Sequence, residues 1–163
     1  MDRRTFLKTS VAMAPAWAGL IGREAVGAAN RSEALRPTLR AVVDDAELFI
    51  GAAVKPGLLE PASPYAQTLA QQFNMLVAEN AMKPATTQPE PGRFDFSKGD
   101  RLLQFAKRHD QTVRGHTLLW HKGLPQWMGK RLANDKALER VMSDHIQQLC
   151  THWAGQIYAW DVV

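Results

Sequence analysis

Two short segments concentrate side chains that could bind a polar ligand. In the first, Glu79, Asn80 and Lys83 bring a carboxylate, an amide and an ammonium group within five residues. Such a set both donates and accepts hydrogen bonds, which is what the hydroxyls of a sugar ring require. From the pattern alone, a solvated loop with a local ion pair between Glu79 and Lys83 remains an equal alternative.

The second segment runs from Arg114 to His121 and reads RGHTLLWH. In an extended strand, residues two apart share a face, so His116 and Trp120 are expected on the same side as Arg114. An indole can cover the apolar face of a sugar while an imidazole bonds to its hydroxyls, although a lone ring of either kind is more often core. His116 and His121 are five apart and expected on opposite faces, which argues against a metal site formed by this pair.

A third segment ends the chain with the letters YAWDVV. On pattern alone it is a strand that carries a buried Asp161. A buried carboxylate needs hydrogen-bond partners, so we expect Asp161 to support its neighbours rather than to react.

Alternating strands and helices are expected to position these segments. Short apolar runs indicate buried strands, and segments with apolar residues at helical spacing indicate helices. Ser32 is the expected cap of the first helix. The expected strands cover 48–54, 75–80, 112–120 and 157–163, and the expected helices cover 32–45, 63–73, 96–109 and 134–155.

This alternation predicts a parallel sheet with helical crossovers. An open doubly wound sheet and a (β/α)8 TIM barrel share that order. The turn Lys55-Pro56-Gly57-Leu58 after the first strand is not the glycine-rich turn of dinucleotide-binding folds. Polar residues gather late in or after the second and third strands, as they do in barrels. The sequence therefore predicts an incomplete (β/α)8 barrel of about the first four βα units.

Residues 1–29 are predicted to be a twin-arginine (Tat) signal peptide. Arg3 and Arg4 precede a moderately apolar run at 11–22, and small residues follow at 26–29. The alternative is a basic N-terminus on an ordinary helix. The apolar run is too short to span a bilayer. We expect recognition by the Tat machinery through Arg3 and Arg4, a periplasmic or extracellular location, and no stable membrane insertion.

Charge and cysteine content limit the classes of function that the sequence allows. The chain has 20 basic and 16 acidic residues, and residues 1–29 hold four basic and two acidic ones, half of the excess. The remaining charge is weak and scattered, which argues against nucleic-acid binding. The single Cys150 cannot form an internal disulfide and is expected to be a buried small hydrophobic residue.

Four segments of the chain resemble the motifs of family 10 glycoside hydrolases. The family patterns run roughly as F-N-x-x-x-x-E-N-x-M-K, P-x-x-G-x-F-x-F, R-G-H-T-L-x-W-H and W-D-V-V-N-E. They match Phe73–Lys83, Pro89–Phe96, Arg114–His121 and Trp160–Val163 in this order, and the resemblance covers about residues 47 to 163. One such motif is a weak signal, whereas four in the same order are highly specific.

The resemblance implies a (β/α)8 barrel that cleaves internal β-1,4 bonds of xylan with retention, using an acid/base glutamate and a nucleophilic glutamate without a metal or organic cofactor. Glu79, Asn80 and Lys83 match residues that bind the sugar two subsites from the bond. His116 and Trp120 match residues that line the subsite where the ring distorts. His121 matches a supporting neighbour.

The chain departs from the family pattern where Pro84 follows Lys83 and where Lys122 and Gly123 follow His121. These changes leave xylan, cellulose and mixed glucans open as the preferred polymer. The family's acid/base glutamate follows W-D-V-V-N and is expected just past Val163, with the nucleophile on a later strand. We therefore expect these 163 residues to be inactive alone. A non-catalytic carbohydrate-binding or remnant half-barrel module is the alternative. An oxidoreductase, which a twin-arginine leader would also suit, is disfavoured because the sequence has neither a glycine-rich turn nor Cys and His residues at metal-binding spacing.

Overall fold

The computed structural model describes residues 37–130 and 134–163, and Thr38–Val163 form one compact unit. The predicted signal peptide lies outside the described residues, so its export role and location stay predictions. Within the described part of the chain, every helix is too short or too polar to cross a membrane.

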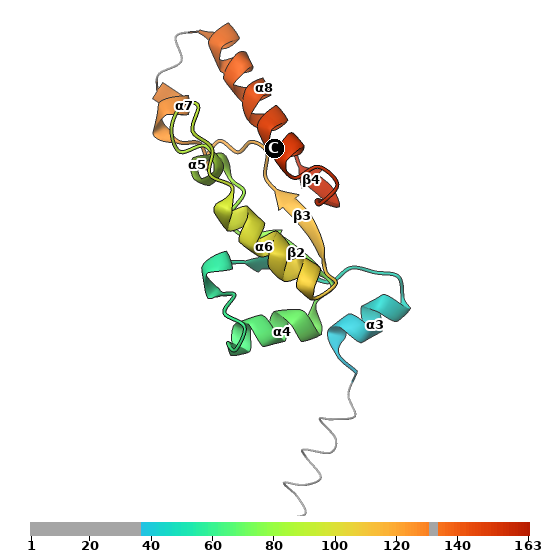
Figure 1. The fold of residues 1–163 in the computed structure, drawn as a ribbon. Coiled ribbons are helices and arrows are strands. Elements are labelled where there is room, and N and C mark those ends of the chain that lie inside the picture. The colour runs from blue at the N-terminus through green and yellow to red at the C-terminus, as the bar shows by residue number, and fades with distance from the viewer. Residues whose placement is uncertain (1–36, 131–133) are drawn as a thin grey trace, which may run out of the picture. The chain divides into compact units, whose positions relative to one another are not determined.

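Four parallel strands form one sheet in the order in which they occur along the chain (Figure 1). They are β1 (Gly51–Val54), β2 (Met75–Ala78), β3 (Thr112–His116) and β4 (Ala159–Asp161). A doubly wound sheet reverses its strand order at a switch point, whereas a barrel adds each strand beside the previous one. The uninterrupted order is that of a partial (β/α)8 barrel, which confirms the predicted fold class.

Helical crossovers join the strands. They are α4 (Pro64–Gln72), α6 (Ser97–Arg108) and α8 (Asp135–His152), close to the bounds expected from sequence. The Ser63 side chain accepts a hydrogen bond from the Ala66 N–H at 3.1 Å, and the Asn134 side chain accepts one from the Ala137 N–H at 3.0 Å. These bonds satisfy N–H groups that the first turn of a helix leaves unpaired, which explains where α4 and α8 begin.

Shorter elements complete the described residues: α3 (Leu39–Asp45), the 3-10 turn η1 (Pro56–Leu58), α5 (Pro84–Thr87) and α7 (Gln126–Lys130). The helix expected over 32–45 corresponds to α3, which begins later. Thr38 has an extended backbone, and its side chain accepts from the Ala41 N–H at 3.1 Å. Thr38 therefore caps α3, and Ser32, the cap expected from the sequence, lies outside the described residues.

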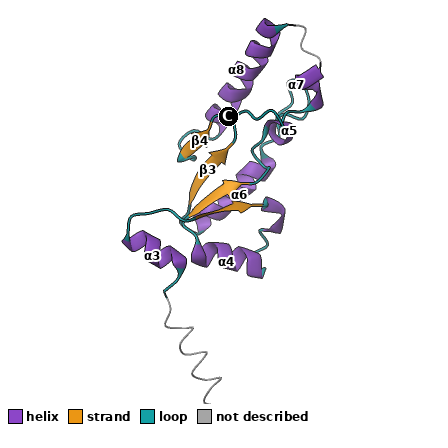
Figure 2. Ribbon diagram, turned by 180° about the vertical axis from the view of Figure 1, so that it is seen from behind, coloured by secondary structure: helices purple, strands orange, loops and turns teal. Residues whose placement is uncertain are grey.

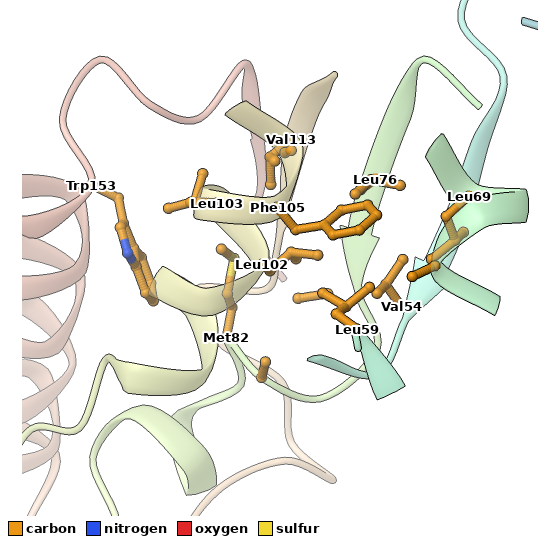
Figure 3. Packing of buried hydrophobic residues seen from close by; sticks show 14 of the residues in the cluster. Val54, Leu59, Leu69, Leu76, Met82, Leu102, Leu103, Phe105, Val113 and Trp153 are labelled. Carbon is orange, nitrogen blue, oxygen red and sulfur yellow. The ribbon is translucent and has the colours of Figure 1, made fainter. Parts of the chain in front are cut away.

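The hydrophobic core lies between the sheet and α6. Val54, Leu76 and Val113 from the first three strands pack with Leu102 and Phe105 of α6 (Figure 3). Each of these side chains is at most 2% exposed. Burying a side chain of this size contributes about 1.5–3 kcal/mol, so this layer holds the strands against the helix.

The same side of the sheet brings a glycine and an indole together. Gly115 of β3 pairs in register with Trp160 of β4. A methyl group added at Gly115 would overlap the Trp160 ring, so the ring occupies the space that a side chain would fill. Trp160 in turn packs against the core.

The opposite face of the sheet carries no helix in the described residues, and Figure 2 looks onto it. Alternate strand residues point to opposite faces, so Ala53, Val77 and Arg114 belong to this side. Ala53 and Arg114 are exposed and Val77 is half-buried. In a closed barrel this face is the interior.

The prediction for Cys150 was wrong, because the side chain is exposed. Its neighbour Leu149 is fully buried on the inner side of α8. Consecutive residues of a helix point about 100° apart, which turns Cys150 away from the core.

Candidate functional site

Four polar residues lie at one level at the carboxyl ends of the strands. Glu79 N–H donates to Val54 O at 3.0 Å, which continues the pairing of β1 with β2 and places Lys55 beside Glu79. The register of β2 with β3 brings His116 to the same level, and His116 pairs directly with Asp161. We call Lys55, Glu79, His116 and Asp161 the polar row. They share the parity of Arg114 and therefore belong to the uncovered face.

Glu79, Asn80 and Lys83 form a chain of contacts after β2. Asn80 Nδ2 donates to Glu79 Oε1 at 3.4 Å, and Lys83 Nζ donates to Asn80 Oδ1 at 2.8 Å. On the other side, Lys55 Nζ lies 3.5 Å from Glu79 Oε1. The side chains of Lys55 and Glu79 are 61% and 38% exposed, and ion pairs this open contribute at most about 1 kcal/mol. Their remaining donors and acceptors are available to a hydroxyl-rich ligand.

Trp120 lies against Lys83. Lys83 Nζ is 4.3 Å from the centroid of the Trp120 ring, a cation–π contact. Gly123 packs against both side chains. A Cβ atom at this position would lie 3.0 Å from Trp120 Cε3 and 3.5 Å from Lys83 Cδ. Gly123 O also accepts from the Ala85 N–H at 2.8 Å. The loop after β3 thus packs on the loop after β2. The Trp120 indole lies beside Lys83, the last residue of the contact chain that begins at Glu79.

The strand expected over 112–120 ends at His116, so its predicted extent was wrong. The chain then turns toward the end of β4, where Leu118 N–H donates to Asp161 O at 3.0 Å and Leu119 N–H donates to Val162 O at 3.1 Å. Trp120 therefore projects from a loop, and the alternation of a strand does not describe its orientation relative to His116.

His116 contacts Asp161, which also binds Arg114. His116 Nδ1 lies 3.1 Å from Asp161 Oδ2, and Arg114 Nε donates to Asp161 Oδ1 at 2.9 Å. The hydrogen bond from Arg114 lowers the pKa of the Asp161 carboxyl, and the bond to His116 acts in the same direction. Asp161 is half-buried rather than fully buried, and it has the supporting contacts that the sequence predicted.

The structure therefore joins Glu79, Asn80, Lys83 and Trp120 in one contact chain. His116 stands with Asp161 in a second cluster on the same row. His121 is exposed, with its ring centroid 6.1 Å from that of Trp120. The roles expected for these residues toward a sugar stay predictions.

Sequence reasoning missed Lys55 as a member of the site. It directly follows an expected strand, which is the same signal that singled out Glu79 after the second strand. In parallel sheets, residues at carboxyl strand ends gather at one edge, and this rule could have found it.

A separate surface groove of about 720 Å³ lies between α6 and the end of α8. Its lining includes Asp100, Lys107, Gln111 and His152 but no Phe, Tyr or Trp side chain, and Gln111 precedes β3 rather than following it. It lacks an aromatic platform for a sugar and does not belong to the polar row. Among the described residues, no cluster of three or more His, Cys, Asp or Glu side chains could hold a metal ion.

Residues 38–163 match the model of glycosyl hydrolase family 10. The chain belongs to this family. Endo-1,4-beta-xylanase A of Thermoanaerobacterium saccharolyticum is 42% identical over 127 residues, which cover 70% of this chain and 11% of that protein. Exoglucanase XynX of Acetivibrio thermocellus is also 42% identical over 127 residues, covering 70% of this chain and 12% of that protein.

Solved structures of similar proteins agree with the partial barrel of this family 10 chain. Xylanase 10B from Thermotoga petrophila, solved with xylobiose, has a TM-score of 0.75 and 32% identity, covering 78% of this chain and 40% of that one. TsXylA from Thermoanaerobacterium saccharolyticum has a TM-score of 0.70 and 38% identity, covering 78% and 43%. The family 10 chain thus spans less than half of either solved chain, and a much smaller share of the two curated relatives.

Proposed function

We propose that the protein containing these residues is an endo-1,4-β-xylanase that cleaves internal xylan bonds with retention of configuration. The observation that carries the proposal is the contact chain from Glu79 through Asn80 and Lys83 to Trp120. It combines hydrogen-bonding groups with an indole at carboxyl strand ends, where barrels place their active sites. The names of the family relatives support xylan as the polymer.

Retaining cleavage requires two carboxyl groups about 5–5.5 Å apart, one acting as acid/base and one as nucleophile. The family pattern W-D-V-V-N-E places the first of them directly after the segment that Trp160–Val163 match. We accordingly propose that the 163-residue chain binds xylo-oligosaccharides and does not hydrolyse them. Glu79 is assigned to substrate binding in this scheme.

Residues 1–29 support a further proposal, that the protein is exported through the Tat machinery. The twin arginines, the apolar run and the small residues stand in the order of such a leader. Replacing Arg3 and Arg4 by Lys should leave the protein in the cytoplasm of a host with a Tat system, and unchanged export would contradict this proposal.

Binding is tested by calorimetric titration of the 163-residue chain with xylotriose and with cellotriose. We expect xylotriose to bind more tightly and Trp120→Ala to weaken its binding by at least about tenfold, because one stacking aromatic ring is lost. Tyr158→Ala is the matched control, since it removes an exposed aromatic ring that precedes β4 and therefore lies at the opposite end of the strands.

The proposal fails if xylotriose does not bind or if Trp120→Ala and Tyr158→Ala weaken binding equally. Tighter binding of cellotriose would instead assign the site to a glucan, as the name of the exoglucanase relative suggests. Reducing-sugar release from xylan by the 163-residue chain would contradict its proposed inactivity.

A further inference from the structure

The short helix α5 begins directly after the contact chain, because Lys83 is its N-cap residue. Lys83 O accepts from the Thr87 N–H at 3.0 Å and from Thr87 Oγ1 at 3.1 Å. Pro84 O accepts from the Gln88 N–H at 2.8 Å. Pro84 and Thr87 are buried, so this turn is held in the core. One bonded helical turn therefore links the position of Lys83 to that of Gln88.

The side chain of Gln88 ties this turn to α8. Gln88 is 3% exposed and His145 is fully buried, and Gln88 Oε1 lies 2.9 Å from His145 Nδ1. An amide oxygen can only accept, so the imidazole donates. Phe94, from the same loop, stacks on the His145 ring with the two centroids 6.3 Å apart. A buried donor that loses its acceptor is costly, so Gln88 is held firmly on α8.

The backbone of Gln88 ties the same turn to the segment after β3. Trp127 Nε1 of α7 donates to Gln88 O at 3.2 Å. Gly123 O accepts from the Ala85 N–H at 2.8 Å. The segment that carries Trp120 is therefore bonded to α5 or the residue after it at two points, and α5 and α7 lie close together in Figure 1.

We infer that Gln88 is a positioning residue that holds Lys83 and Trp120 in their mutual contact. Lys83 Nζ lies 4.3 Å from the centroid of the Trp120 ring, and the two residues belong to different loops. Gln88 is bonded to the segments that carry both, while its own side chain is buried away from any ligand. The consequence for sugar binding rests on the proposed function, whereas the consequence for the Lys83–Trp120 contact does not.

The first test is Gln88→Met in the 163-residue chain, because Met has a similar length but lacks the amide oxygen. Without its acceptor, His145 no longer fixes α5. We expect the indole N–H signal of Trp120 to move in a proton–nitrogen NMR spectrum. We also expect calorimetric titration to show xylotriose binding weakened by at least about threefold, as for the loss of a cation–π contact. An unchanged Trp120 signal in the folded Gln88→Met chain would overturn the inference.

The matched control is Gln111→Met. Gln111 Nε2 donates to Leu69 O at 2.9 Å and to Phe73 O at 2.8 Å, and Gln111 precedes β3, at the opposite end of the strands from the polar row. This substitution should lower stability but leave the Trp120 signal and the affinity for xylotriose unchanged. Equal changes of signal and affinity in Gln88→Met and Gln111→Met would indicate only a general loss of structure and refute a positioning role.

A double-mutant cycle separates positioning from an independent effect of Gln88. If Gln88→Met already breaks the Lys83–Trp120 contact, adding Lys83→Met should weaken xylotriose binding by a smaller factor than Lys83→Met does alone. Equal factors in the two backgrounds would mean that Gln88 does not act through Lys83, which contradicts the inference.

Trp127→Phe provides a second variant if Gln88→Met does not fold. It keeps an aromatic ring and removes only the N–H group that donates to Gln88 O. The Trp120 indole signal is expected to move in this variant as well. A signal that stays in place would show that the bond to Gln88 does not position Trp120.

The proposed function and this inference fail separately. A chain that does not bind xylotriose would contradict the function, and the Trp120 signal would still decide the inference. A chain that binds xylotriose, and whose Gln88→Met variant keeps both the Trp120 signal and the affinity, would refute the inference alone.

Discussion

Phe49 and Tyr158 precede the first and last strands of the sheet, yet their ring centroids lie 5.1 Å apart. Two strands separate β1 from β4, which corresponds to about 14 Å in a flat sheet. The two rings meet because both side chains reach across the beginning of the sheet and because the sheet curls. The curvature of a barrel wall is therefore present within these four strands.

The close approach of Gly115 to Trp160 makes Gly115 sensitive to any side chain. Gly115→Ala should lower the free energy of unfolding by about 1–3 kcal/mol, because the new methyl group overlaps the indole ring. Urea unfolding followed by tryptophan fluorescence measures the effect. Gly57→Ala is the control, since a Cβ atom there meets nothing within 4 Å and should change stability by less than about 0.5 kcal/mol. Equal effects of the two substitutions would contradict this packing.

His145 should make stability depend on pH. The side chain is fully buried, Nδ1 lies 2.9 Å from Gln88 Oε1, and Nε2 has no partner among the described residues. Burial lowers the pKa of His145 from 6.5 to about 4. Between these values the unfolded chain binds a proton that the folded chain does not, so stability is complete above the unfolded pKa and is lost as pH falls toward 4. The full difference is on the order of 3 kcal/mol.

The measurement is urea unfolding at about pH 7 and about pH 5, in the window that the two pKa values of His145 define. His145→Gln removes the titrating group, so the loss of stability between the two pH values should become smaller. His121→Gln replaces an exposed histidine and should leave the dependence unchanged. A dependence that is the same in all three chains would show that His145 is not its source.

Lys83→Met should weaken xylotriose binding by at least about threefold with little change in stability. The substitution removes the hydrogen bond to Asn80 and the cation over the Trp120 ring, and an exposed cation–π contact contributes about 0.5–1 kcal/mol. Calorimetric titration measures the affinity. Lys98→Met, which removes the same charge from an exposed position of α6, should bind like the unsubstituted chain. Unchanged affinity in Lys83→Met would remove Lys83 from the site.

Arg114→Gln should raise the pKa of the Asp161 carboxyl, because the hydrogen bond and charge of Arg114 are what lower it most. The folded-state pKa is depressed, so the stabilisation from this carboxylate is complete above the ordinary pKa of aspartate and is lost as pH falls below that value and through the lower pKa of Asp161. A carbon-13 NMR titration of the carboxyl group measures the shift. Arg108→Gln, on the exposed side of α6, is the control and should leave the Asp161 titration unchanged.

Most of the sheet and its crossovers could be predicted, because the apolar runs and the apolar residues at helical spacing are also the residues that the fold buries. The run Met75–Ala78 is almost entirely buried, and α6 has apolar residues at helical spacing. The end of β3 could not be found in this way. Thr117, Leu118 and Leu119 are 1%, 5% and 9% exposed, so this loop is as buried as a strand. Hydrophobicity reports burial, and it cannot separate a buried loop from the strand that it follows.

The members of the candidate site were named from their types and from the family resemblance, but their contacts were not. Lys83 and Trp120 are 37 positions apart, and no periodicity relates the loops that carry them. Their meeting depends on the docking of one loop on another, which Gly123 permits by leaving room for both side chains. The pairing of His116 with Asp161 likewise depends on the register of two strands.

The small residue beneath Trp160 also restricts how the strands can be aligned. Moving β3 along its neighbours by one position would exchange its two faces. Arg114 or His116 would then press against Leu102 and the rest of α6, where an unpaired charge or imidazole is strongly disfavoured. A misaligned chain therefore loses its apolar contacts together with the alignment of the polar row. Packing on the α6 side of the sheet in this way enforces the correct assembly of the polar row on the opposite side.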